Sequence, residues 1–573
     1  MFETEKVVEI KTCRHCNSSF EITDKDLEFY QKVSPSFGGK KYNIPSPSLC
    51  PDCRQQRRLS FRNEKKLYKR RCDATGKEII SIYSPDKPYK VYEQSYWWSD
   101  NWNPLDYGRD FDFSKSFFSQ FDELMKEIPK IAIFRDKSME NSDYSNYGQY
   151  CKNTYLCNNC YNLSNSYYST SCFPFIHNEE TQNIDCEDCN DSSFIYECID
   201  LKESYNCFYS NKLEGCNDCY FCDNLFGCSF CLFSINQKNK KLLFLNNQIT
   251  KDEFIKVKEK ILTDNKYKDE VLSKYELLKD KSPQLYCRNK NFQNVFGDNI
   301  INSKNLKNCF FVGSTENSKF LYVSGYFSKN MYDGMNSGGK SELTYETLHM
   351  HGNYKSCFII DIDDSKNCYY DFQCFSCQDC FGCIGLRNKS YCILNKQYTK
   401  EEYEVLVPKI IEHMMKTGEW GEFFPSSLSP FGYNETVAQE YFPISRDKAL
   451  PYLYKWSDYE PPFPKVDKII PANKLPEDIK DIPDDILNWA IECEITKKPF
   501  RIISQELEFY RKHNLPIPKR HPDQRHLDRM ALRNPRKLFD RKCDKCGKDI
   551  KTTYSPDRKE IVYCEECYNK EVY

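Results

Sequence analysis

The chain has 573 residues, with 82 Lys and Arg against 84 Asp and Glu, so its net charge is -2. The length predicts about four domains, and the balanced charge excludes a chain that acts as a whole as a polycation on nucleic acid. Aromatic residues make up 15% of the chain, which excludes general disorder, and the lack of a long apolar run excludes a transmembrane protein.

The first residues have neither the basic nor the apolar segment of a signal peptide, so we expect a cytoplasmic protein. The chain holds 32 cysteines. In a reducing compartment so many cysteines indicate metal sites or buried thiols rather than a disulfide framework. Ten cysteines lie towards the two ends and 22 lie between Cys151 and Cys392, so we expect the ends and the middle to use cysteine differently.

The N-terminal region, residues 1–106, contains two C-x-x-C turns. These are Cys13 with Cys16, and Cys50 with Cys53. Two thiolates on one tight turn supply half of a tetrahedral zinc site, and a second turn closes the site without an open position. The spacing predicts a zinc module in which metal binding contributes to folding.

A second module is predicted over residues 486–573 because this part repeats the N-terminal part. Phe20 matches Phe500, an offset of 480 residues. The C-terminal copy then has a shorter loop, after which the match continues at an offset of 471 residues, so that Cys72 matches Cys543. Each module has two positions at which four ligands could form a metal site, which we call knots. The N-terminal copy has kept all four cysteines of the first knot, and the C-terminal copy has kept all four cysteines of the second. Cys72 and Cys493 are therefore the single cysteines of two degenerate knots. We predict two zinc ions per chain, the second one held by Cys543, Cys546, Cys564 and Cys567.

The pattern C-x-x-C, then Leu27-Glu28-Phe29-Tyr30, then Cys50-Pro51-Asp52-Cys53-Arg54 resembles a bacterial zinc-ribbon domain. The resemblance covers residues 13–58 and, in a metal-poor form, residues 493–529, and it implies zinc binding only. The whole chain is also similar to large cysteine-rich proteins of candidate-phyla bacteria. That second resemblance implies no activity.

Residues 107–143 are predicted as an aromatic connector with a helix over 117–128. Beyond them, pairs of Cys and an apolar residue recur about every twelve residues, as at Cys207, Cys219 and Cys231. This period suits one strand and one turn per repeat, which predicts a β-solenoid. A longer repeat matches Cys219 with Cys368, so the solenoid is duplicated, with one half at 144–248 and the other at 286–396.

Each half is followed by a predicted helix that begins with a capping box, at Thr250 and at Thr399. We assign residues 249–285 to a helical insert and 397–420 to a helix. Residues 421–485 are rich in proline, so we expect an extended linker on the surface. The predicted fold class is mainly β with peripheral helices, in which two zinc-ribbon-like modules flank a duplicated short-period β-solenoid.

The cysteines of the middle region leave three interpretations open. Cys374, Cys377, Cys380 and Cys383 form a run that is similar to an iron–sulfur ligand string. We favour an inward ladder of thiols, because cysteine is small and readily buried. An additional zinc site and an iron–sulfur cluster are the alternatives.

Two motifs suggest an enzyme. Residues 334–341 satisfy the P-loop string, but no apolar strand precedes them and a strand-like run follows, so we predict a turn. Asp361, Asp363 and Asp364 could serve acid–base chemistry on a solenoid face. We predict no catalytic residue and no small-molecule substrate, and an enzyme acting on a glycan or a nucleotide remains the alternative.

Each module also carries a stripe of basic residues at helical spacing. We predict that these stripes contact nucleic acid, either RNA or single strands, and the alternative is that they dock the modules on the solenoid. The predicted function is a non-catalytic zinc-binding scaffold or adaptor, with a protein–protein scaffold without nucleic acid as a further alternative. The residues of the stripes are Arg54, Arg57, Arg58, Arg62, Lys65 and Lys66 in the first module, and Arg525, Arg529, Arg533 and Arg536 in the second.

Overall fold

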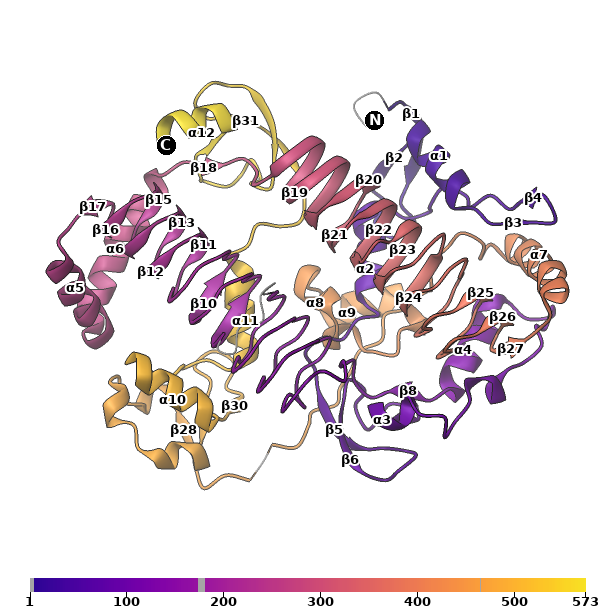
Figure 1. The fold of residues 1–573 in the computed structure, drawn as a ribbon, viewed down its shortest axis with the longest axis horizontal. Coiled ribbons are helices and arrows are strands. Elements are labelled where there is room, and N and C mark those ends of the chain that lie inside the picture. Colours follow the sequence, from indigo (N-terminus) through magenta and orange to yellow (C-terminus); the bar gives the residue numbers. More distant parts are fainter. Residues whose placement is uncertain (1–4, 174–180, 464, 573) are drawn as a thin grey trace.

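The computed structural model describes residues 5–173, 181–463 and 465–572. The fold is mainly β, with helices around it, and its centre consists of two stacks of short parallel-paired strands (Figure 1). Stack 1 comprises residues 135–248 and stack 2 comprises residues 290–397, in both cases for the part that the structure describes.

Strands in stack 1 pair in parallel with strands twelve residues further along the chain. β12 (Asn217–Tyr220) pairs with β14 (Ser229–Leu232), which pairs with β16 (Lys241–Phe244). A second column of strands includes β9 (Asn183–Glu187) and β10 (Ile195–Ile199). The twelve-residue period expected from the sequence is therefore the period of strand pairing.

The chain turns a corner at every third residue through most of both stacks. Asn153, Leu156, Asn159, Asn162 and Asn165 all have positive φ values, between 49° and 54°. Asparagine adopts this left-handed conformation more readily than other residues with a side chain, which accounts for its frequency in these segments. Twelve residues per turn and a corner at every third residue give each turn four sides of three residues.

The residue that follows each corner points into the stack. Cys151, Thr154, Cys157 and Cys160 are all buried, and the same register continues through both stacks. Four short sides leave little space inside, so Cys, Ser, Thr and Leu occupy most of these positions. A column of cysteine side chains therefore forms part of the core of each stack.

Stack 2 begins with β19 (Lys290–Gly313) and ends with β25 (Gln378–Phe381), β26 (Ser390–Ile393) and β27 (Lys396–Gln397). Most of its turns also have twelve residues, as Cys380 pairs with Cys392. The offset is thirteen residues between β20 (Thr315–Lys319) and β22 (Ser328–Gly338), and again between β22 and β23 (Glu342–His351). Each of these turns accommodates one extra residue without a change in the parallel pairing, which continues to β24 (Cys357–Asp363).

Helices lie beyond the last turn of each stack (Figure 1). α5 (Lys251–Thr263) and α6 (Asn265–Lys281) follow stack 1, and α7 (Lys400–Thr417) follows stack 2. Capping boxes at Thr250 and Thr399 begin α5 and α7, as predicted. These helices cover apolar side chains where the strand pairing stops.

The two terminal modules repeat each other element by element. The first helix of each module keeps the register in which Phe20 matches Phe500, and the elements that follow keep the register in which Cys72 matches Cys543. In the N-terminal module these elements are α1 (Asp24–Val33), α2 (Pro51–Leu59), β5 (Tyr68–Arg71) and β6 (Glu78–Ser81); in the C-terminal module they are α10 (Ser504–His513), α11 (Pro522–Ala531), β31 (Phe539–Lys542) and β32 (Asp549–Thr552).

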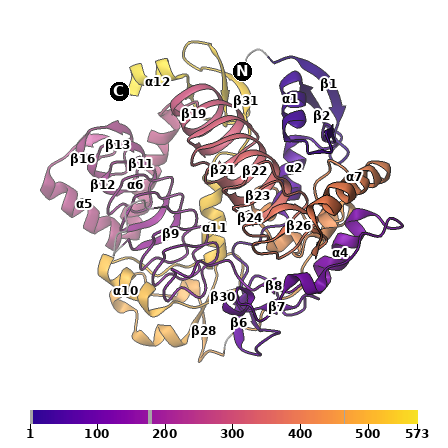
Figure 2. The same ribbon diagram turned by 45° about the vertical axis from the view of Figure 1, so that its right-hand side comes forward.

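The helices of each module dock on the stack that is more distant in sequence. α1 and α2 pack against stack 2, where the rings of Phe29 and Tyr332 stack with centroids 3.7 Å apart. α11 packs against β9 and β10 of stack 1, and it lies between the two stacks in both views (Figures 1 and 2).

The second half of each module pairs with the chain that enters the other stack. β7 (Val91–Tyr92) pairs in parallel with β8 (Lys130–Ile131), just before stack 1. β33 (Val562–Tyr563) pairs in parallel with β18 (Gln284–Leu285), just before stack 2. Each module therefore contacts both stacks: its helices pack on one stack, and its second half pairs with the strand that leads into the other. The two modules make these contacts in the same way.

The connector contains α4 (Phe117–Glu127), where a helix was expected. The expectation of an extended surface linker over residues 421–485 is wrong for most of the segment, although residues 455–463 have no helix or strand and are mostly exposed. Elsewhere this segment forms short helices, among them α8 (Val437–Tyr441) and α9 (Arg446–Ala449), and its aromatic rings enter the main core. Burial of these rings outweighs the tendency of the prolines to keep the chain extended.

Candidate metal centres and the docking interface

Two sets of four cysteines lie close enough together to hold a metal ion. In each set the four Sγ atoms lie within 4.8 Å of one another. The first set is Cys13, Cys16, Cys50 and Cys53, and the second is Cys543, Cys546, Cys564 and Cys567. Both sets are the ones predicted from the sequence, and four sulfur ligands leave no open position for a substrate.

A tight turn positions the first two thiols of each set. The amide of Cys13 donates to the carbonyl of Ser18, and the amide of Asn17 donates to the carbonyl of Cys13. Cys543 makes the same pair of hydrogen bonds with Lys548 and Gly547. Asn17 and Gly547 both have positive φ, so a residue that tolerates this conformation is required at the end of each turn.

The degenerate knots keep this backbone geometry without the ligands. Cys72 and Cys493 stand at the first position of the same turn, with the same backbone hydrogen bonds. The amide of Glu93 donates to the Sγ of Cys72, as the amide of Cys564 does to the Sγ of Cys543. The fold of the turn therefore does not depend on a complete set of ligands.

Close packing of the thiols shifts their pKa values. A hydrogen bond from Cys53 lowers the pKa of Cys50 to about 5, and the same contact raises the pKa of Cys53. Burial acts against ionisation of Cys543, but backbone amides of Cys564 and Cys546 lower the pKa of its thiol to about 6. Thiolates, which are the form that binds metal, are thus favoured at one position of each set.

The basic stripe of the first module lies in an internal interface. Arg54 and Arg58 on α2 are almost fully buried, with exposed fractions of 2% and 1%. Arg58 contacts Glu346 at 3.0 Å and Asp333 at 3.4 Å, and Arg54 contacts Asp333 at 2.9 Å. Asp333 and Glu346 occupy the same corner of successive turns of stack 2.

The second module makes the equivalent contacts with stack 1. Arg525 and Arg529 are the counterparts of Arg54 and Arg58 in the repeat, and both pair with Asp185, with Arg529 at 3.0 Å. Arg529 also lies 3.2 Å from Glu197. Asp185 and Glu197 again occupy one corner of successive turns, so the docking of the module has been duplicated with it.

Most of the basic residues for which we predicted nucleic-acid contact are paired inside the chain, which is the arrangement that the docking alternative expects. Arg62 is buried and pairs with Glu64, while Arg57 and Arg533 are nearly buried and pair with Glu346 and Glu187. Arg536 is half-buried, 4.0 Å above the ring of Tyr441. Lys66 keeps a partly exposed side chain, and it pairs with Asp523.

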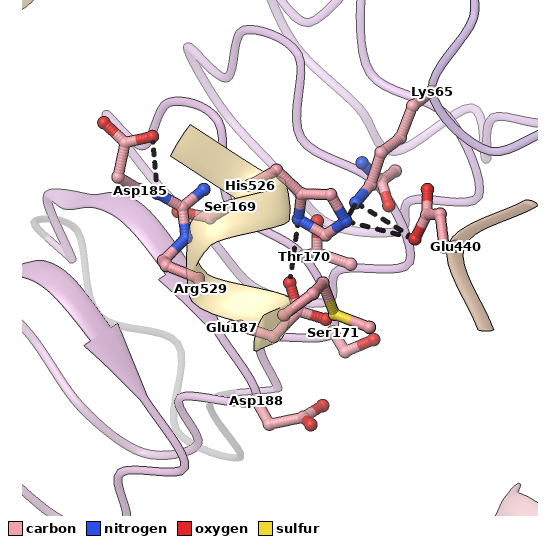
Figure 3. A network of polar contacts seen from close by, with 12 residues as sticks. Lys65, Ser169, Thr170, Ser171, Asp185, Glu187, Asp188, Glu440, His526 and Arg529 are labelled. Atoms are coloured by element: carbon pink, nitrogen blue, oxygen red, sulfur yellow. Dashed lines mark hydrogen bonds and ion pairs between the residues drawn. The ribbon is translucent and has the colours of Figure 1, made fainter. Parts of the chain in front are cut away.

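The two modules meet at a polar network around His526 of α11 (Figure 3). His526 lies between Glu187 of stack 1, at 3.4 Å, and Glu440 of α8, at 3.1 Å. Lys65 of the first module contacts both His526 and Glu440. Burial and Lys65 lower the pKa of His526, but Glu440 and Glu187 outweigh them, and the pKa lies above the ordinary value of 6.5.

The two motifs that suggested an enzyme lie on strands and corners of stack 2. Residues 334–338 of the P-loop string lie in β22, and Glu342 begins β23 directly after the turn, so no helix follows to present its amide groups to a phosphate. Among the carboxylates, Asp361 lies 3.1 Å from His349 and Asp363 lies 3.2 Å from His351.

The sequence reasoning did not identify the acidic partners of the arginines. Asp185 and Glu197 stand twelve residues apart, as do the aromatic residues Tyr209, Phe221 and Phe233 that continue the same corner. The rings stack with centroids 4.6 Å apart. The sequence did contain a signal for this interface. Acidic residues recur at the twelve-residue period, and the arginines that pair with them recur at helical spacing.

Comparisons with known proteins identify no family. No family model matches the chain, and no curated protein matches it. A crystal structure of a provisionally assigned acetyltransferase from Desulfovibrio desulfuricans G20 aligns at 10% identity with a TM-score of 0.10. The alignment covers 41% of this chain and 62% of that chain, so the chain spans less than two thirds of its length. In the described residues no helix has the length and apolar character required to cross a membrane.

Proposed function

We propose that the protein is a non-catalytic scaffold, in which two zinc-ribbon-like modules clamp a duplicated β-solenoid formed by stacks 1 and 2. The observation that carries the proposal is the burial of Arg54, Arg58, Arg525 and Arg529 against carboxylates of the stacks. Because a buried charge without a partner is costly, these pairs favour the one arrangement of module and stack in which all four arginines are paired. The outer faces of the stacks then remain for a partner, which we propose to be a protein.

Zinc is the metal that best suits the two four-cysteine sets. Four thiolates in two tight turns match the tetrahedral coordination of Zn²⁺, and a closed site of this kind is structural. Each set lies in a module that contacts both stacks. Zinc binding at either set therefore stabilises the arrangement of the whole molecule as well as its own module.

The stripes give little support to nucleic-acid binding. Phosphate contact requires exposed basic side chains, and most of these arginines are paired inside the chain. A titration of labelled single-stranded RNA at rising salt tests this part of the proposal. We expect no binding whose log affinity falls with log salt, and such binding would restore RNA as the partner.

Metal removal tests the scaffold. We expect a chelator to strip zinc from both cysteine sets and to increase hydrogen exchange in α2, α11 and the corners that they cover. Cys16→Ser should release the zinc of the first set, whereas Cys72→Ser, at the degenerate knot, should leave the zinc content unchanged. A folded protein without zinc at either set, or unchanged exchange after zinc removal, would contradict the proposal.

A further inference from the structure

A carboxylate stands inside stack 2, where the other inward positions hold mainly thiols, hydroxyls and apolar groups. Asp371 follows the corner at Tyr370, so its side chain points inward, and it is fully buried. The equivalent position of stack 1, in the register that matches Cys219 with Cys368, holds Cys222. An ionised carboxylate in such an interior carries a large desolvation penalty unless a positive charge compensates it.

The hydrogen bonds of Asp371 leave one oxygen without a donor of good geometry. Its Oδ1 accepts a hydrogen bond from the amide of Cys383 at 2.7 Å, whereas its Oδ2 accepts none of good geometry from the described residues, and the thiol of Cys368 is the side-chain donor beside the carboxyl group. Cys222 differs, because its Sγ donates to the carbonyls of Tyr220 and Cys231, both at 3.4 Å. No described Lys, Arg or His forms an ion pair with Asp371.

Two thiols lie beside the carboxyl group of Asp371. The Sγ atoms of Cys368 and Cys380 and a carboxylate oxygen of Asp371 all lie within 4.8 Å of one another, and all three side chains are buried. Cys377 lies beside this group, and its thiol is in hydrogen-bonding contact with Cys380. Three potential ligand atoms thus lie close together, and the Sγ of Cys377 is a neighbouring candidate for the fourth.

We propose that stack 2 holds a third metal ion, a zinc ion bound by Cys368, Cys380 and the Oδ2 of Asp371, with Cys377 as the fourth ligand. Thiolates exclude the hard cations Mg²⁺ and Ca²⁺, whereas sulfur with one carboxylate oxygen suits Zn²⁺. The bound thiols lose their protons to solvent. Because all three ligand side chains are buried in the finished stack, we expect the ion to bind while the stack folds. The ion attracts the Asp371 carboxylate, and backbone amides such as that of Cys383, which donates to Oδ1, stabilise the negative charge that remains on the four ligands.

The zinc content of the full-length chain tests this site. We expect three zinc ions per chain in the unmodified protein and two in Asp371→Asn, which cannot offer an anionic oxygen. Asp379→Asn, at a corner of the same stack, is the matched control and should retain three. Cys222→Asp places the same three ligand types in stack 1, beside Cys219 and Cys231, and should raise the count to four.

A second measurement does not depend on how well the variants fold. The unmodified chain is reconstituted with ¹¹³Cd²⁺, and its cadmium NMR spectrum is recorded. We expect two resonances from sites with sulfur ligands only and a third that is displaced because one ligand is oxygen. Two resonances and two zinc ions in the unmodified chain would overturn the proposal, as would iron in place of zinc at this site.

Discussion

Arg58 on α2 is held between two carboxylates of stack 2 and is almost entirely shielded from water. Its equivalent, Arg529 on α11, is held in the same way in stack 1. When a buried cation of this kind is removed, its partners remain in the interface without a compensating charge. The cost of that state exceeds the cost of losing the contact itself.

We therefore predict that Arg58→Ala lowers the free energy of unfolding by about 3–5 kcal/mol. Arg14→Ala is the control, since the side chain of Arg14 is 71% exposed and pairs at the surface with Glu422. Its effect should stay below about 1 kcal/mol. Urea unfolding of both variants checks the prediction, and equal effects would show that the buried pairs do not secure the module.

The pH dependence of stability should report on His526. Its folded-state pKa lies above 6.5, because Glu440 and Glu187 outweigh burial and Lys65. Its contribution to stability is thus complete below the unfolded-state pKa and is lost as the pH rises through the folded-state pKa. We predict that His526→Gln flattens this fall in stability as the pH rises above 6.5. Unfolding midpoints measured across that range should show the same fall in His413→Gln as in the unmodified protein, because His413 is partly exposed and lies outside this network.

At the scale of a single turn, the narrow interior limits which side chains fit. Ser210, at another inward position, donates to the carbonyl of Phe208 at 2.9 Å, so a hydroxyl can replace a thiol there. We predict that Cys219→Ser changes the free energy of unfolding by less than about 1 kcal/mol, whereas Cys219→Phe lowers it by about 1–3 kcal/mol through overpacking. Denaturant unfolding compares the two, and a tolerated phenylalanine would mean that the stack has spare volume.

The corners impose a different limit. Asn153 has a φ of 53°, and its amide side chain lies in a ladder with Asn141 at 3.1 Å and Asn165 at 3.0 Å. We predict that Asn153→Val costs about 1–2 kcal/mol from the backbone conformation alone. Asn153→Gly removes the ladder contacts, but glycine adopts a positive φ without a steric penalty. It should therefore destabilise the protein less than Asn153→Val does. Thermal unfolding of the pair checks the order, and the reverse order would show that the side-chain ladder decides.

The sequence predicts the elements better than it predicts their contacts. A recurrence every twelve residues, as in Cys207, Cys219 and Cys231, is visible in the sequence because each turn must place a small residue inside. The capping boxes at Thr250 and Thr399 are visible for a similar reason, since their hydrogen bonds are local. The aromatic packing of residues 421–485 depends on surfaces supplied by other parts of the chain, and local composition does not reveal it.

The four-cysteine sets were predictable because each combines two local turns. The positions of Arg54 and Arg525 were not, because their partners Asp333 and Asp185 lie in the opposite half of the chain. A basic stripe has the same appearance in a sequence whether it meets phosphates or buried carboxylates. The duplication of the stripe distinguishes contact with phosphates from contact with buried carboxylates only once the acidic corners of the stacks are known.

At the scale of the whole molecule, each half of the chain lacks the surface on which its own module docks. The docking surface of α2 is on stack 2, and that of α11 is on stack 1. We predict that residues 1–281 and 282–573, expressed separately, aggregate or expose apolar surface, and that the two fragments co-purify as one complex when expressed together. Size-exclusion chromatography of the separate and co-expressed fragments checks this. A stable, monomeric first fragment would show that its module does not need the distant stack.

The regular corners also restrict how this gene can change in evolution. An insertion or deletion of twelve codons adds or removes a whole turn and leaves every other residue on its former side. A change of one or two codons shifts inward residues to the outside, except where a turn takes up the extra residue, as between β22 and β23. We therefore expect natural variants of this chain to differ in length within the stacks by multiples of twelve residues, so that turn number changes while the ends, and the modules that bind them, stay constant.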